Sequence, residues 1–101
     1  MYTVLQSGAF KEWVSGLKDA RARARIAARV RRAELGNFGD SKSVGGGVSE
    51  MRIDHGPGYR LYFTVRGQSL ILLLCGGDTR TQVTDIRRAQ QMLSELKRDF
   101  T

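Results

Sequence analysis

The sequence has little of what disulfide-bonded, metal-binding or membrane-spanning proteins need. It holds one cysteine, Cys75, and one histidine, His55, so a disulfide framework and a Cys/His zinc site are both excluded. The longest apolar run, Leu70–Cys75, spans six residues, far fewer than the roughly 20 that a membrane helix requires. Residues 1–6 lack the pattern of a signal peptide. We therefore expect a cytoplasmic protein that contacts no membrane and uses no metal or cofactor.

No internal repeat and no low-complexity linker divides the chain. Its 101 residues are the length of one ordinary domain. We therefore expect residues 1–101 to form a single domain with one shared core.

Positive charge is in clear excess. The chain has 17 Lys and Arg against 10 Asp and Glu, a net charge of +7, and most of the cations are arginines. The planar guanidinium suits phosphate, and a basic excess in a small domain indicates a nucleic acid or an acidic protein partner. A merely soluble basic surface is the alternative interpretation.

Helical periodicity appears near both ends of the chain. Ser7 is a plausible N-cap, and Phe10, Trp13 and Leu17 follow at helical spacing. A second helix is predicted from Asp19, its N-cap, to about residue 35, where Gly36 ends it. A last helix is predicted from about residue 81 to residue 97.

Strand patterns occupy the remainder. We predict strands at about residues 2–5, 48–54, 59–66 and 69–75, the last of them central and covered on both faces. The glycine-rich segment 36–47 is expected to be a flexible loop, in which Lys42 is a possible phosphate contact. The predicted order is β-α-α-β-β-β-α, an α+β fold in which two helices precede an antiparallel meander.

The second predicted helix carries two parallel stripes. Its apolar stripe is Ala22, Ile26, Val30 and Ala33, and its basic stripe is Arg21, Arg25, Arg29 and Arg32. Residues 21–32 hold six arginines and no acid, so this face repels itself. An acidic partner or a phosphate would relieve the repulsion; an ordinary solvated face is the alternative.

The hairpin at residues 48–66 is the strongest candidate site. In the second strand, parity turns Tyr59, Leu61, Phe63 and Val65 toward the core and Arg60, Tyr62, Thr64 and Arg66 away from it. A turn centred on Gly56 places Arg52 opposite Arg60 and Glu50 opposite Tyr62. Like charges facing each other destabilise a sheet, which favours an anion between them. Alternatively, both arginines splay into water or Glu50 neutralises them.

Several ordered motifs resemble one family. They are Phe10-x-x-Trp13-x-x-x-Leu17, Gly36-Asn37-Phe38-Gly39-Asp40, Val48-x-Glu50-x-Arg52-Ile53, Gly56-Pro57-Gly58-Tyr59-Arg60-x-Tyr62-Phe63, and Gly76-Gly77-Asp78 with Thr81-Gln82-x-x-Asp85-Ile86. Together they cover nearly the whole chain. They are similar to the HigB-like "addiction module killer" branch of the RelE/ParE toxin superfamily.

The resemblance implies a bacterial type II toxin that a cognate antitoxin holds inactive. It also implies a small antiparallel sheet with two N-terminal helices on one side and the last helix on the other. Most characterised RelE-like and HigB-like members cleave mRNA in the ribosomal A site, whereas the ParE-like branch poisons DNA gyrase. The antitoxin is expected to bind the basic stripe of residues 21–32.

The resemblance also assigns roles to individual residues. Arg60 stands where the RNase members contact the scissile phosphate, and Arg52 is the basic position of the preceding strand. The Gly-Gly-Asp-Lys motif of the family reads Gly-Gly-Asp-Thr here, and Arg80 is the substitute for its lysine. The tyrosine that some relatives place near the start of the last helix is absent, with Asp85 near that position.

Metal-free RNA cleavage needs a base for the 2′-OH, cations for the phosphorane and an acid for the leaving oxygen. Arg60, Arg52 and Arg80 fit the cationic role. Arginine does not act as a base, so Glu50 is the predicted base. Lys42, Tyr62 and Arg66 are the predicted RNA contacts. The alternatives are a non-catalytic toxin that binds a protein such as gyrase, and a degenerate toxin that only binds nucleic acid.

Overall fold

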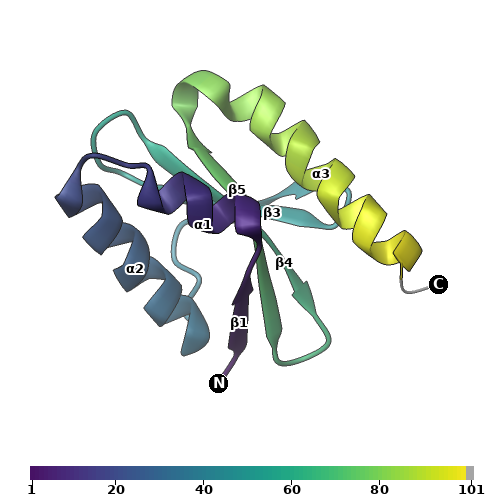
Figure 1. The fold of residues 1–101 in the computed structure, drawn as a ribbon. Coiled ribbons are helices and arrows are strands. Elements are labelled where there is room, and N and C mark those ends of the chain that lie inside the picture. Colours follow the sequence, from purple (N-terminus) through teal and green to yellow (C-terminus); the bar gives the residue numbers. More distant parts are fainter. Residues whose placement is uncertain (100–101) are drawn as a thin grey trace.

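The computed structural model describes residues 1–99 as one five-stranded sheet with three α-helices (Figure 1). The strands are β1 (Thr3–Gln6), β2 (Ser41–Gly45), β3 (Val48–Ile53), β4 (Tyr59–Arg66) and β5 (Leu70–Asp78). The helices are α1 (Gly8–Ser15), α2 (Ala20–Glu34), the short 3-10 helix η1 (Thr79–Thr81) and α3 (Gln82–Asp99). The predicted α+β class is confirmed.

The sheet is mixed, with the strand order β1-β5-β4-β3-β2. The pairs β2–β3, β3–β4 and β4–β5 are antiparallel, but β1 runs parallel to β5, with Thr3 opposite Leu70 and Gln6 opposite Leu73. The prediction of a purely antiparallel sheet was therefore wrong at one edge. Parallel neighbours need a long crossover, and here α1, α2 and the meander together form that connection.

The segment predicted as a flexible loop contains a strand. β2 pairs with β3, with Lys42 opposite Glu50 and Ser43 opposite Ser49. The glycines of residues 45–47 form the tight turn between these strands, with φ values of 94°, 66° and 82°. Only glycine adopts such values readily. The glycine run therefore closes a hairpin, and the loop prediction was wrong for residues 41–45.

Both predicted N-caps are confirmed. The Ser7 side chain accepts a hydrogen bond from the backbone N–H of Phe10 at 3.0 Å, and Asp19 accepts from the N–H of Arg21 at 2.9 Å. These bonds satisfy N–H groups that a helix start leaves without partners. At the other end of α2, Gly36 has a φ of 94° and stops the helix.

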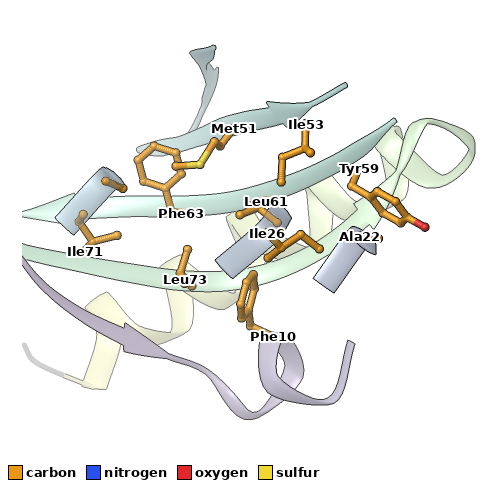
Figure 2. Packing of buried hydrophobic residues seen from close by; sticks show 11 residues of the cluster. Phe10, Ala22, Ile26, Met51, Ile53, Tyr59, Leu61, Phe63, Ile71 and Leu73 are labelled. Carbon is orange, nitrogen blue, oxygen red and sulfur yellow. The ribbon is translucent and has the colours of Figure 1, made fainter. Parts of the chain in front are cut away.

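Helices cover both faces of the sheet (Figure 1). On one face, α1 and α2 bury an apolar cluster that includes Phe10, Ile26, Leu61 and Phe63 (Figure 2). On the other face, α3 buries a second cluster: Val48, Tyr62, Leu74, Cys75, Ala89 and Leu93. Side chains that alternate along β4 thus enter two different cores, and the face predicted to point away from the core is also covered.

Gly76 and Gly77 let the two layers approach the end of β5 closely. A Cβ atom on Gly76 would lie 2.3 Å from ring atoms of Trp13 in α1, and one on Gly77 would lie 1.9 Å from Oδ2 of Asp85 in α3. Neither distance is possible for a real side chain. The pair therefore acts as a contact point for both helical layers rather than as a simple break in the strand.

Candidate functional site: a polar pocket at the β3–β4 turn

The β3–β4 hairpin brings two arginines to the same end of the sheet. Arg52 lies directly opposite Arg60 in the ladder, which confirms the predicted register. Gly56 and Gly58 in the turn have φ values of 57° and 83°, so glycine lets the turn close without strain. This register therefore concentrates positive charge beside the turn, where the two like charges repel each other.

A pocket of about 450 Å³ opens beside these arginines. Its polar wall includes Asp40, Arg52, Asp54, Arg60 and Thr79, and the turn itself supplies Pro57. The pocket therefore combines two cations, two carboxylates and a hydroxyl. Its size is within the range of small-ligand sites, and its charges suit an anion that also carries hydrogen-bond donors.

Arg60 is the buried cation of the pocket, with 7% of the residue exposed. Its Nη1 donates to Oε1 of Glu50 at 3.2 Å, and its Nη2 lies 3.4 Å from Oγ1 of Thr79. Its Nε is buried and finds no partner among the described residues. A buried N–H without an acceptor costs about 1–3 kcal/mol, so Arg60 retains capacity for a further acceptor.

Glu50, the predicted base, lies inside the protein with an exposed fraction of 0%. Besides the Arg60 ion pair, its Oε2 accepts hydrogen bonds from Tyr62 Oη at 3.1 Å and from Gln82 Nε2 at 2.9 Å. A base must reach the proton that it removes, and this carboxylate is enclosed by its partners. The structure therefore corrects the base assignment: Glu50 is a partner that holds Arg60.

Tyr62 is fully buried beneath α3, which corrects its predicted contact with RNA. Burial, reinforced by the nearby Glu50 carboxylate, raises the pKa of the Tyr62 hydroxyl well above its ordinary value. The hydroxyl consequently stays protonated and donates to Glu50 at all ordinary pH values. Tyr62 thus supports the site from behind and does not stack on a ligand.

Arg29 of the predicted antitoxin stripe hydrogen-bonds the backbone of Arg52, a residue of the pocket wall. Its guanidinium donates to the carbonyl oxygens of Arg52 at 2.5 Å and of Phe38 at 3.1 Å, and the side chain is half-buried. Burial lowers its pKa from the ordinary value. Arg21, Arg25 and Arg32 of the stripe are exposed as predicted, so Arg29 differs from them in tying α2 to the hairpin.

Arg80 lies outside the pocket wall, where Thr79 takes the place next to Arg60. Its side chain is 81% exposed and pairs with Asp78 at 2.9 Å. Asp78 also accepts from the backbone N–H of Arg80 at 2.9 Å and caps η1. The hydrogen bonds from Arg80 hold the pKa of the Asp78 carboxyl below its ordinary value. The structure thus separates Arg80 from the cation pair.

Lys42 and Arg66, the other predicted RNA contacts, lie elsewhere on the sheet. Lys42 is exposed on β2 and lies opposite Glu50 in the ladder. Arg66 ends β4, six residues beyond Arg60, which is roughly 20 Å at the strand rise of about 3.4 Å per residue. Arg66 lines a different hollow. The pocket therefore brings together only Arg52 and Arg60 of the predicted cations.

That second hollow, of about 480 Å³, lies between the β1–β5 edge and α3. Leucines and Met92 dominate its wall, with Arg66 and Glu95 as its charged members. It lacks the paired cations of the first pocket, which is therefore the better anion site. Within residues 1–99, no group of three His, Cys, Asp or Glu side chains is arranged to hold a metal, and no helix has the length and apolarity to cross a membrane.

No model of a known protein family matches the chain. A protein of Haemophilus influenzae (strain ATCC 51907 / DSM 11121 / KW20 / Rd), described as an uncharacterized protein, is 51% identical over 87 residues. The chain belongs to the family of this Haemophilus influenzae protein. The alignment covers 86% of this chain and 88% of the relative.

Four residues that shape the site were not predicted from the sequence. Asp40, Asp54 and Thr79 line the pocket, and Gln82 hydrogen-bonds Glu50. Asp40 and Gln82 are part of the motifs that suggested a family resemblance, yet a motif position alone does not reveal which pocket a side chain reaches. Asp54 and Thr79 directly flank strand residues that were singled out, and only the folded turn brings them together.

Proposed function

We propose that this chain is the toxin of a bacterial type II toxin–antitoxin pair. We propose further that it acts in the cytoplasm as a metal-free, ribosome-dependent mRNA endoribonuclease. The observation that carries this proposal is the Arg52–Arg60 pair facing across the ladder at a polar pocket. Two cations held at one point are suited to the negative charge that develops on a phosphodiester during cleavage.

The pocket supports a division of chemical roles. Arg60, held from behind, and the exposed Arg52 would stabilise the phosphorane charge. Asp40 and Asp54 are the carboxylates on the pocket wall, and they replace Glu50 as the groups to test for proton transfer with the 2′-OH. Thr79 adds a hydroxyl next to Arg60, suited to a hydrogen bond with a phosphate oxygen.

The proposed antitoxin would approach the basic surface of α2. Arg21, Arg25 and Arg32 are exposed there, and the chain carries a net charge of +7. An acidic antitoxin segment would relieve the repulsion between these side chains. Attraction of this kind speeds association and weakens with salt. Since Arg29 of the same helix bonds the Arg52 carbonyl, this surface adjoins the pocket.

The experiment is induced expression in bacteria, with growth and the 5′ ends of cleaved mRNA measured together. We expect growth arrest and cuts positioned within ribosome-bound codons. Arg60→Ala should abolish both at matched expression, whereas Arg87→Ala, at an exposed position of α3, should abolish neither. Toxicity that survives Arg60→Ala would place the active surface elsewhere. Arg60→Lys restores charge without the planar fork and should recover toxicity only in part.

One observation favours a second function, binding without chemistry. The predicted base Glu50 is enclosed, so the pocket would hold a phosphate or an acidic side chain without cleaving anything. A non-catalytic toxin that binds a protein target such as DNA gyrase, or a degenerate toxin that only binds nucleic acid, fits this arrangement. Growth arrest with intact mRNA and inhibited DNA supercoiling would support the toxin that binds DNA gyrase. Absence of toxicity would support the degenerate toxin that only binds nucleic acid.

A further inference from the structure

The Glu50 carboxylate is held by three donors from two other elements of the fold. Arg60 and Tyr62 come from β4, Gln82 is the first residue of α3, and Glu50 itself lies on β3. The distances to its oxygens are 3.2 Å from Arg60 Nη1, 3.1 Å from Tyr62 Oη and 2.9 Å from Gln82 Nε2. Tyr62 and Gln82 share one carboxylate oxygen, and Arg60 uses the other.

Stability alone does not account for this arrangement. Moving two opposite charges out of water costs about as much as their attraction returns, so apolar residues of similar volume are often at least as stabilising. The cluster lies on the α3 side of the sheet, where Val48, Leu74 and Leu93 provide an apolar surrounding. What the hydrogen bonds do provide is direction, since they leave the Glu50 carboxylate a single orientation.

We propose that Gln82 and Tyr62 are positioning residues of the anion site, because they orient Glu50 and Glu50 in turn fixes the Arg60 guanidinium at the pocket. The ligand class is an oxyanion, in substrate form a phosphodiester. This inference rests on the proposed function in one respect: it takes the pocket beside Arg60 as the place where the anion binds.

Gln82 and Tyr62 act through Glu50 because neither lines the pocket, whereas Arg60 does. Without them the Glu50 carboxylate could rotate, and Arg60 would lose the partner that holds its Nη1. The Arg60 side chain would then sample orientations in which Nη2 leaves Thr79. An anion would have to restrict that motion on binding, which lowers its affinity. The two donors therefore preorganise the cation before the anion arrives.

Binding of inorganic sulfate, followed through the Arg60 Nε–H and nearby amide signals in NMR spectra, tests the proposal. Gln82→Met keeps the size of the side chain and removes the donor, and Tyr62→Phe removes only the hydroxyl. Each should weaken sulfate binding by about three- to tenfold, which is less than the more than tenfold expected when a ligand loses a hydrogen bond to a charged group, because the lost bond acts on sulfate only through Glu50 and Arg60. All variants are compared at a temperature where circular dichroism shows them folded.

Gln90→Met is the matched control. Gln90 also lies on α3, is also half-buried, and its Nε2 donates to the carbonyl of Val44 at 3.1 Å and not to Glu50. It therefore loses an equivalent amide hydrogen bond without touching the network. Sulfate binding by Gln90→Met should equal that of the unmodified chain.

Gln82→Glu provides a second readout that a purely structural role would not move. The introduced carboxyl group donates to Glu50 only while it is protonated, and the neighbouring carboxylate raises its pKa above the ordinary value of about 4.3. Sulfate keeps its charge across this range. Sulfate binding by Gln82→Glu should therefore be weak near neutral pH and recover on acidification toward pH ~5, whereas Gln82→Met should show no such recovery.

The outcomes separate this inference from the proposed function. If Arg60→Ala binds sulfate as well as the unmodified chain, the anion site is misplaced and both ideas fall. If Arg60→Ala loses binding while Gln82→Met and Tyr62→Phe bind like Gln90→Met, the site stands and the positioning role is overturned. The proposal is supported if sulfate binding is weakened in Arg60→Ala, Gln82→Met and Tyr62→Phe, is unchanged in Gln90→Met, and recovers in acid in Gln82→Glu. This holds even where no RNA is cleaved.

Discussion

The two faces of the sheet are both buried, but they are built differently. Under α1 and α2, every fully buried side chain of the cluster is apolar, as Leu61, Phe63 and Ile71 illustrate (Figure 2). Under α3, the core also contains the Glu50–Arg60 ion pair and the Tyr62 hydroxyl. The apolar face stabilises the fold, whereas the charged part of the other face orients the Arg60 guanidinium through its bond to Glu50. Burial on a sheet therefore does not by itself separate a structural face from a functional one.

The largest effect on stability should follow loss of the charge that balances Arg60. Glu50→Ala leaves the buried Arg60 without its ion-pair partner and leaves Tyr62 and Gln82 without an acceptor. Breaking a buried pair in this way costs about 3–5 kcal/mol, much of the stability of a small domain. The measurement is urea unfolding, with Ser49→Ala on the same strand as the control. A loss under about 1 kcal/mol would mean that the carboxylate is not needed to balance Arg60.

A comparable substitution on the apolar face should reduce stability but not anion binding. Leu61 is 0% exposed and points to the α1–α2 side, so Leu61→Ala creates a cavity costing about 2–5 kcal/mol. At a temperature where the variant remains folded, sulfate affinity should match that of the unmodified chain. If Leu61→Ala weakens sulfate binding as strongly as Tyr62→Phe, the two faces are not separable as described.

Much of this arrangement follows from the sequence. The alternation along residues 59–66 correctly assigned Leu61 and Phe63 to the core, and a turn centred on Gly56 correctly set Arg52 opposite Arg60. These features are local, because side-chain parity and turn length fix them within a few residues. The N-caps Ser7 and Asp19 were predictable for the same reason.

What the sequence did not reveal depends on how α3 docks. On the second face of β4, the polar residues alternate with apolar ones as they would in a strand with one face in solvent. Tyr62 of β4 and Glu50 of β3 are buried only because α3 covers this face. Gln82 and Thr79 are common polar residues whose partners come from other strands. Strand β2 was missed because five residues beside a glycine-rich turn carry too short an alternation to distinguish an edge strand from a loop.

The adjacent glycines of β5 provide a medium-sized test of the same comparison. Gly76→Ala should displace the Trp13 ring on the apolar face, and Gly77→Ala should displace Asp85 on the α3 face. Forced overpacking of this kind costs about 1–3 kcal/mol. Because the chain has one tryptophan, its fluorescence spectrum should shift in Gly76→Ala and stay unchanged in Gly77→Ala. Equal spectra in both variants would show that the glycines do not separate the layers.

The smallest effect on stability is expected where the N-terminus of α2 meets the β3–β4 turn. Nε2 of His55, in the turn, lies 3.0 Å from Oδ2 of Asp19, the N-cap of α2. This hydrogen bond, together with the one from the Ala22 N–H, holds the pKa of the Asp19 carboxyl below its ordinary value. A depressed carboxyl pKa stabilises the fold above the unfolded value of about 3.9, and that contribution disappears as pH falls through the folded value.

His55→Ala should therefore raise the pKa of Asp19 toward its ordinary value, which a carbon-detected NMR titration of the carboxyl measures directly. The bonds from the α2 backbone remain, so the shift should be reversed only in part. The variant should be slightly less stable than the unmodified chain near neutral pH, and the two unfolding curves should converge once acid has protonated Asp19 in both. The effect is small because the Asp19 side chain is 45% exposed, and water screens such a pair. An unchanged Asp19 pKa would show that the hairpin and α2 are joined by Arg29 without help from His55.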